Sequence, residues 1–180
     1  MKKVVLAVGQ FVPRKGYDVL LQAWKQCDQN NELWIIGGDA PDEYIELKNT
    51  LRLSNVYFMG FKCKENLMEY YKAADLFVHP TREDIWGLVI NEALANGLPV
   101  VTTDRCIGGC ELVQEGINGY IVPVGDSEKL AIAIMKILED DELRKEMSEN
   151  SIKKIKNWTI EEMAKQHYKI LEEYDKKNEK

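Results

Sequence analysis

Lys15 is a positive charge in a short segment bounded by two glycines, directly after the first apolar run of the chain. Gly9 and Gly16 permit a compact loop there, and a lysine ammonium is a point charge that suits a diphosphate. The segment is not a Walker loop, and Gly-x-Gly-x-x-Gly is absent from the chain, which weakens ATPase and NAD-enzyme interpretations. A single lysine before a loop glycine is most often a surface residue, so this feature needs support from others.

Glu92 is a carboxylate in a segment, residues 87–95, in which only Asn91 is also polar. A helix that is apolar nearly all round is typically buried, so we expect Glu92 to be buried too. A buried carboxylate must accept hydrogen bonds from a cation, a backbone amide or ligand hydroxyls, and vicinal ribose hydroxyls would serve. The alternative is a structural glutamate that a neighbouring strand or an arginine satisfies.

The start of the same helix should leave backbone N–H groups free at Trp86, Gly87 and Leu88, which makes an anion site. Gly87 would let a phosphate approach the backbone. Asp84 lies just before this point, and it either caps the helix or accepts sugar hydroxyls. The sequence does not choose between these two roles.

These residues need elements that bring their loops together. Short β-rich runs alternate with segments of helical periodicity, a rhythm that predicts a parallel sheet with helices on both faces. We therefore expect an α/β fold with three α/β/α layers, a mainly parallel sheet of about six strands, and C-terminal helices. Ligands of such folds bind at the carboxyl ends of the strands, where the glycine-rich segments fall. The expected strands are Val4–Val8, 33–36, 56–59, Leu76–His79, Val100–Thr103 and 120–122, and the expected helices are 17–27, 42–53, 65–73, 87–96 and 111–114.

The last third of the chain begins after a turn signal at residues 116–119. One more strand and then two or three helices should follow. Asp126 or Ser127 should start the first of these helices, and Thr159 with Glu162 forms a capping box for the last.

The composition is typical of one folded domain rather than a membrane or nucleic-acid-binding protein. With 180 residues, of which 45% are hydrophobic and 30% charged, we expect a single domain over residues 1–180. No stretch approaches the roughly 20 apolar residues of a membrane span. The net charge of −6 argues against broad attraction to nucleic acid. The four cysteines lack metal-site spacing, so we expect reduced thiols, no metal and a cytoplasmic setting.

Taken together, these motifs resemble the C-terminal domain of retaining glycosyltransferases with the GT-B fold, specifically family 4. The resemblance covers essentially the whole chain and follows the family's order. Its elements are the loop with Lys15, the pair Asp84 and Glu92 within Asp-x-Trp-Gly-Leu-Val-Ile-Asn-Glu-Ala, and the later segments 97–100 and 118–120. It implies a Rossmann-like domain that binds a nucleoside-diphosphate sugar. The reaction would transfer the glycosyl group to an acceptor hydroxyl with retention, with no metal and no other cofactor.

The resemblance also implies residue roles. Lys15 would contact the donor diphosphate, and Glu92 would bind the ribose hydroxyls. Asp84 would hold hydroxyls of the donor sugar where the family more often has Glu, with Glu83 as a less favoured substitute. These roles make Lys15, Asp84 and Glu92 the expected catalytic set. Neither Asp84 nor Glu92 is expected to be a nucleophile, because the family's leaving phosphate is thought to act as the base.

The other donor-binding positions that the resemblance implies lie in the loops and at the helix start. They are Gly9, Gln10, Arg14, Gly87, Leu88 and Val89, with Gly60 and Phe61 bordering the base. Two departures from the family pattern affect this set. Gln10 stands where many members carry an arginine, so Lys15 would act with less help or Arg14 would swing in. The segment before Glu111 is one residue shorter than usual, which leaves Glu111 either near the donor or in a simple turn into a capped helix.

A nucleotide sugar is the expected partner, and nucleic acid is not. The family's N-terminal acceptor domain has no counterpart in these residues, so we expect it to be absent or to be a separate subunit, and membrane association would involve only that half. Self-association stays open. The alternatives are a GT-B-fold epimerase fragment and a non-catalytic nucleotide-sugar-binding subunit. A phosphorylase is disfavoured because no pyridoxal-phosphate lysine setting is found, and a flavodoxin-like receiver or redox protein is disfavoured by Lys15 and Glu92 together.

Overall fold

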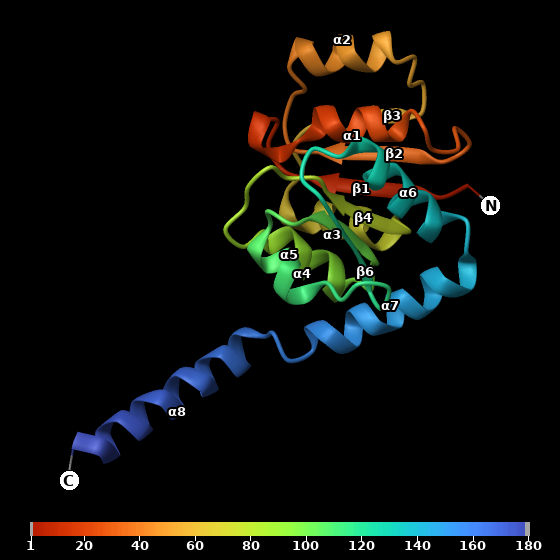
Figure 1. Cartoon of the computed structure of the whole chain (residues 1–180). Coiled ribbons are helices and arrows are strands. Elements are labelled where there is room, and N and C mark those ends of the chain that lie inside the picture. Colours follow the sequence, from red (N-terminus) through yellow and green to blue (C-terminus); the bar gives the residue numbers. More distant parts are fainter. Residues whose placement is uncertain (1, 179–180) are drawn as a thin grey trace.

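The computed structural model describes residues 2–178, which fold around one six-stranded sheet (Figure 1). The strand order is β3-β2-β1-β4-β5-β6, and every neighbouring pair is parallel. The sequence predicted each strand to within one residue at either end. The strands are β1 (Val4–Val8), β2 (Glu32–Ile36), β3 (Val56–Phe58), β4 (Leu76–His79), β5 (Val100–Thr103) and β6 (Gly119–Val122).

Helices cover both faces of the sheet, as the crossover connections predicted. One core lies beneath the first two and the sixth helix, and the other beneath the third, fourth and fifth. The expected three-layer α/β/α architecture is therefore confirmed. The helices of these layers are α1 (Tyr17–Trp24), α2 (Asp42–Thr50), α3 (Lys64–Ala73), α4 (Leu88–Ala95), α5 (Ile107–Leu112) and α6 (Ser127–Leu138).

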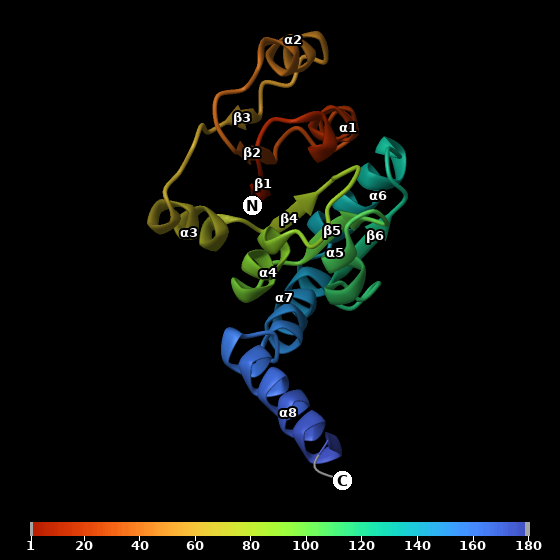
Figure 2. The same ribbon diagram turned by 90° about the vertical axis from the view of Figure 1, so that its left-hand side faces the viewer.

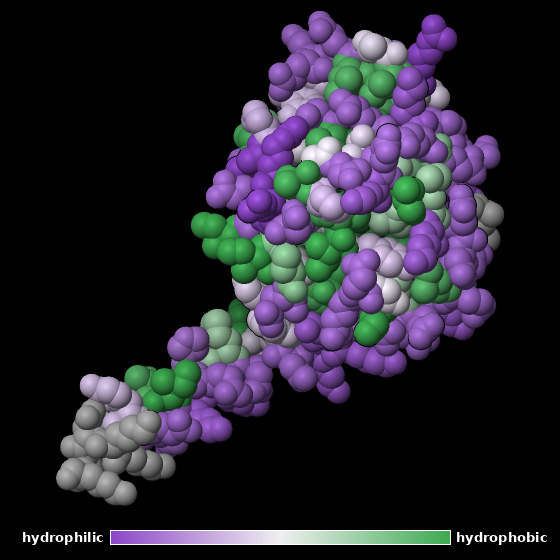
Figure 3. All heavy atoms as spheres, in the orientation of Figure 1, coloured by the Kyte–Doolittle hydropathy of each residue, from purple (hydrophilic) through white to green (hydrophobic). Residues whose placement is uncertain are grey.

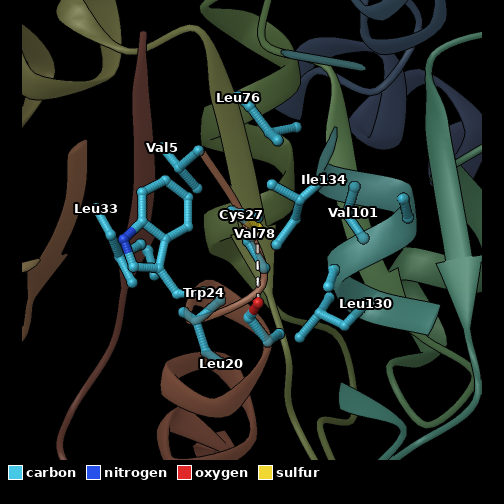
Figure 4. Close-up of a cluster of buried hydrophobic side chains, with 14 of the residues drawn as sticks. Val5, Leu20, Trp24, Cys27, Leu33, Leu76, Val78, Val101, Leu130 and Ile134 are labelled. Atoms are coloured by element: carbon cyan, nitrogen blue, oxygen red, sulfur yellow. Dashed lines mark hydrogen bonds between the residues drawn. The ribbon is translucent and has the colours of Figure 1, made fainter. Parts of the chain in front are cut away.

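The central strand β1 divides its side chains between the two cores. Val5 and Ala7 belong to the core with α1 and α6, whereas Leu6 and Val8 belong to the core with α3 and α4. Successive side chains of a strand point to opposite faces, so a strand covered on both faces must be apolar throughout. Figure 4 shows the first core, in which the fully buried Trp24 of α1 lies beside Val5.

Two helices complete the chain, α7 (Asp141–Ile155) and α8 (Ile160–Asn178). Thr159 caps α8, because its hydroxyl accepts the N–H of Glu162 at 3.1 Å. In both ribbon views α8 extends away from the body of the domain (Figures 1 and 2). Its apolar side chains alternate with polar ones on the surface (Figure 3), and several large ones are exposed: Ile160, Met163, Tyr168, Ile170, Leu171 and Tyr174. None of the helices in the described residues is long and apolar enough to cross a membrane.

Three helices differ from their expected bounds by more than one residue. α1 and α2 each end three residues early. After α2 the cause is Arg52, whose φ of +59° lies in the left-handed region, where a helix stops. The expected helix at residues 111–114 is wrong, because α5 spans Ile107–Leu112 and contains both glycines. Close packing requires glycine in this helix: a Cβ at Gly108 would lie 2.1 Å from the carbonyl oxygen of Trp86, in the loop between β4 and α4.

Candidate functional site

The carboxyl ends of β1 and β4 meet where the strand order reverses. From β1 the chain moves outward to β3, then returns across the sheet to β4 and continues to β6. The loops after β1 and β4 therefore lie at the switch point of the strand order, which is the usual ligand position in parallel α/β sheets. Lys15 follows β1, and Asp84 and Glu92 follow β4, so the topology brings the three predicted residues to one edge.

The loop after β1, residues 9–16, is compact because of its two glycines. Gly9 has a φ of +153° and Gly16 a φ of +68°, and the short helical turn η1 (Pro13–Lys15) lies between them. A Cβ at Gly16 would lie 2.1 Å from the carbonyl oxygen of Pro80, so only glycine fits there. The loop consequently presses on the start of the β4–α4 loop, and Lys15 is only 9% exposed.

Thr81 and Arg82 fasten the two loops together. The Thr81 hydroxyl and the Arg82 backbone N–H both donate to the carbonyl oxygen of Arg14, at 2.8 and 2.6 Å. The Arg82 guanidinium donates to the carbonyl of Pro13 at 2.6 Å and to both carboxylate oxygens of Asp18 at 2.8 and 2.6 Å. These contacts fix the position of Lys15 relative to the β4–α4 loop.

Asp84 is the centre of a charged cluster. Its Oδ2 accepts hydrogen bonds from the Lys15 ammonium at 2.5 Å and from His79 Nε2 at 3.0 Å. The Arg14 guanidinium lies 3.9 Å from the same oxygen. Lys15 has three N–H donors and uses one of them on Asp84. The cluster thus contains spare positive donors next to a carboxylate whose Oδ1 has no hydrogen-bond partner among the described residues.

The environment sets the protonation states of this cluster. The hydrogen bonds from His79 and Lys15 hold the pKa of Asp84 well below its usual range, so it is a carboxylate at neutral pH. Burial lowers the pKa of His79, although the bond to Asp84 opposes this. A carboxylate can only accept, so Nε2 of the neutral imidazole carries the proton.

The start of α4 is open to a ligand. Gly87 precedes the helix with a φ of +74°, and no side chain caps the helix. The Ile90 N–H bonds to the Gly87 carbonyl at 2.8 Å, whereas the N–H groups of Leu88 and Val89 stand in the first turn, where helices have no internal partner. The helix begins one residue later than expected. Asp84 accepts hydrogen bonds from Lys15 and His79 and does not cap α4, so the capping role predicted as one of two alternatives is wrong.

Glu92 corrects an expectation: its side chain is exposed, not buried. Ile90 and Leu94 of α4 face the sheet, but Leu88, on another side of the helix, is 68% exposed. Part of the surface of this apolar helix is therefore exposed, so its apolar composition does not show that Glu92 is buried. Glu92 still has one specific partner, because the Tyr71 hydroxyl donates to its Oε2 at 2.8 Å.

The other predicted positions differ in their exposure and in the strand that they follow. Gln10 and Glu83 are exposed, and Glu111 is exposed on α5. Gly60, with a φ of +67°, and the 81% exposed Phe61 follow β3 at the far edge of the sheet. Within the described residues neither of these two makes a hydrogen bond to the Lys15–Asp84 cluster. The Arg14 guanidinium lies at the border of that cluster, 3.9 Å from Asp84 Oδ2.

Sequence reasoning missed His79 and Tyr71. His79 had a readable signal, because it is the last residue of a predicted strand and lies five positions before Asp84. Tyr71 had none, because only the packing of α3 and α4 on the same face of the sheet brings its hydroxyl to Glu92. Across residues 2–178, no group of three or more histidine, cysteine or acidic side chains is arranged to hold a metal.

Comparison with known proteins places this geometry in a family. Residues 1–154 match the family model described as glycosyl transferases group 1. A glycosyltransferase of Methanocaldococcus jannaschii is 32% identical over 171 residues, which are 93% of this chain and 47% of that protein. The chain thus spans about half the length of the curated relatives it matches.

Solved structures agree in fold and in extent. Sucrose-phosphate synthase from Thermosynechococcus elongatus has a TM-score of 0.86 at 31% identity, over 96% of this chain and 45% of that one. Anabaena HepE, solved in complex with UDP and glucose, has a TM-score of 0.86 at 27% identity, over 96% of this chain and 48% of that one. The matched segment is again about half of each relative. The chain belongs to the family of glycosyl transferases group 1.

Proposed function

We propose that this chain is the donor-binding domain of a glycosyltransferase and binds a nucleoside-diphosphate sugar at the carboxyl edge of its sheet. The observation that carries the proposal is the meeting of Lys15 and Asp84, from two different loops, at 2.5 Å beside the uncapped start of α4. A diphosphate needs positive charge and free amides, and a sugar needs hydroxyl acceptors. This edge offers both, and the solved complex of a family member with UDP and glucose supports the same ligand class.

In this proposal Lys15 and the amides of Leu88 and Val89 bind the diphosphate. Negative charge grows on the diphosphate as the glycosyl bond breaks, so these donors stabilise the transition state more than the ground state. The spare N–H groups of Lys15 make this compatible with its bond to Asp84. Asp84 Oδ1 would accept sugar hydroxyls, and Glu92 would accept ribose hydroxyls.

The stereochemical outcome that we propose is retention. Its support is the motif resemblance to family 4 together with the fixed roles of the two carboxylates. Asp84 is held by Lys15 and His79, and Glu92 by Tyr71, which supports roles as hydroxyl acceptors rather than as nucleophiles. We propose that the transfer needs no metal, and donor binding should therefore survive EDTA.

Acceptor binding is proposed to involve residues outside this domain. In the relatives the matched segment is about half of the chain. Large apolar side chains at and near the ligand edge, Ile85 and Leu88, are 80% and 68% exposed, as expected for a wall that another surface closes.

The test is a calorimetric titration of the chain with UDP, GDP, ADP and their sugar conjugates. The proposal predicts that one nucleoside diphosphate and its sugar conjugate bind with 1:1 stoichiometry, in the presence and absence of EDTA. Failure of all three series to bind would refute the proposal, and binding that requires a divalent metal would refute its metal-free form.

A further inference from the structure

We propose that Tyr71 is a positioning residue for nucleotide binding: its hydroxyl holds one oxygen of Glu92 and thereby directs the other at the ribose hydroxyls. This inference rests on the proposed function, because it assigns a further residue to the same site. Tyr71 lies on α3, outside the loops that carry the other site residues.

The position of Tyr71 is rigid. Its side chain is fully buried, and its ring lies 5.7 Å from the ring of Phe77 on β4. Its hydroxyl lies 2.8 Å from Glu92 Oε2 on α4. A buried aromatic ring has few alternative rotamers, so the hydroxyl is a fixed donor.

The direction of the hydrogen bond follows from chemistry. A carboxylate only accepts hydrogen bonds, so Tyr71 must donate. Burial raises the pKa of the Tyr71 hydroxyl, and the charge of Glu92 adds to this rise, so the proton stays on the tyrosine. Glu92 Oε1 has no hydrogen-bond partner among the described residues, and it is therefore available to a ligand.

An exposed glutamate needs this kind of support. A free glutamate side chain samples several rotamers, and fixing them on binding costs free energy. The bond from Tyr71 restricts Glu92 before the ligand arrives. Asp84 is treated in the same way, because Lys15 and His79 both bond Oδ2 and leave Oδ1 without a partner in the described residues. Both carboxylates at this edge are thus held through one oxygen.

The experiment compares Tyr71→Phe with the wild-type chain in binding UDP, GDP and ADP and their 2′,3′-dideoxy forms. We expect the wild type to prefer the ribonucleotide that it binds, and Tyr71→Phe to weaken binding of that ribonucleotide by roughly 3- to 10-fold. Binding of the dideoxy form should not change, because it has no ribose hydroxyls for Glu92. In a Glu92→Ala background, Tyr71→Phe should have no further effect.

Tyr70→Phe is the matched control. Tyr70 is the neighbouring residue on α3, and its ring packs against Trp34. Among the described residues its hydroxyl makes no hydrogen bond to Glu92, so the variant should bind both forms of the nucleotide as the wild type does. Melting temperatures of all variants check the fold.

The outcomes separate the two claims. Equal weakening of ribose and dideoxy ligands in Tyr71→Phe would show a merely structural tyrosine and overturn the inference alone. So would wild-type discrimination that Tyr71→Phe leaves intact. A wild-type chain that binds none of the three nucleotides would overturn the proposed function and, with it, this inference.

Discussion

Asp84 and a nucleotide diphosphate would share the positive charge of Lys15, which has N–H donors for both. In the structure Lys15 donates to Asp84 Oδ2, and both side chains are largely buried. Burying an ion pair costs solvation free energy, which the pair recovers only with good geometry and further hydrogen bonds. His79 supplies such a bond to Asp84. The charge state of this site therefore depends on all three residues.

Removing the positive charge of Lys15 and removing the negative charge of Asp84 should have different effects on diphosphate binding. Lys15→Ala removes a charged donor, so the nucleoside diphosphate should bind roughly 10- to 100-fold more weakly, while the bare nucleoside is unaffected. Asp84→Asn removes the competing charge, so the diphosphate should bind as well as before or better, while the added affinity from the sugar shrinks. Calorimetric titration with the nucleoside, the nucleoside diphosphate and the sugar conjugate measures the affinity that the diphosphate and the sugar each add. Equal losses for nucleoside and diphosphate in Lys15→Ala would contradict the assignment.

His79 should make stability depend on pH in a defined window. The unfolded chain has an ordinary histidine pKa of about 6.5, whereas burial lowers the pKa in the folded chain. Below about pH 6.5 the unfolded state therefore binds more protons, so the free energy of unfolding falls as the pH falls, by up to about 1.4 kcal/mol per unit. Well above about pH 6.5, His79 is neutral in both states and no longer makes the free energy of unfolding depend on pH.

The measurement is urea unfolding at pH 7.5, 6.5 and 5.5. His79→Gln should flatten the decline between pH 6.5 and 5.5, and a glutamine can still donate towards Asp84. His167→Gln, at an exposed position on α8, is the control and should retain the wild-type slope. A His79→Gln slope equal to that of the wild type would disprove the role of burial.

Sequence reasoning located the residues of the site better than their environments. Lys15 and Asp84 could be placed at one edge because loops after β1 and β4 share that edge in a parallel sheet. Their contact, the proton on His79 and the contact between Tyr71 and Glu92 depend on side-chain packing between distant segments. The burial of Glu92 was predicted wrongly, because apolar neighbours indicate a buried helix only where something covers them.

At the scale of elements, one glycine sets the distance between the two loops. A Cβ at Gly16 would lie 2.1 Å from the Pro80 carbonyl oxygen, and its φ is +68°. Gly116 has a similar φ of +73°, but a Cβ there meets nothing within 4 Å. A side chain at either position would incur backbone strain, but only at Gly16 would it also clash with a neighbouring loop.

Gly16→Ala should therefore destabilise the chain more than Gly116→Ala. Both variants incur a left-handed backbone cost of roughly 1–2 kcal/mol. Gly16→Ala must also push the β1–α1 loop away from Pro80, which should add at least about 1–3 kcal/mol and displace Lys15. Urea unfolding gives the stabilities, and nucleotide titration gives the effect on the site. Equal destabilisation by the two substitutions would mean that the loops can separate freely.

Elements followed from sequence where burial was uniform. Strands β1, β4 and β5 were predictable because nearly all of their residues are buried, which requires continuous apolar runs, whereas the edge strand β3 leaves Tyr57 41% exposed. The ends of α1 and α2 were not, because a left-handed residue such as Arg52 or a tightened last turn has no clear signature. The predicted position of α5 was wrong because two consecutive glycines are typical of a turn. In the structure they lie within α5, where close packing against the β4–α4 loop leaves no room for a side chain at Gly108.

At the scale of the whole molecule, the chain should bind donor without completing transfer. In the proposed function the ligand edge binds diphosphate, ribose and sugar, and acceptor orientation comes from other residues. Positioning two reactants contributes about 7 to 11 kcal/mol to rate enhancement, so its loss should remove most turnover. Assays with labelled sugar nucleotides would check this, and donor binding should still raise the melting temperature. Robust multiple-turnover transfer by this chain of 180 residues would contradict the proposal.

In the proposed function a nucleoside diphosphate binds where β1 and β4 end. The most direct test is an amide NMR titration of the chain with the nucleoside diphosphate that it prefers. We expect the perturbed resonances to lie in residues 9–16 and at the start of α4, with Leu88 and Val89 among the largest shifts. Shifts that gather instead at the opposite end of the sheet, around Lys3 and Asn31, or no shifts at all, would contradict it.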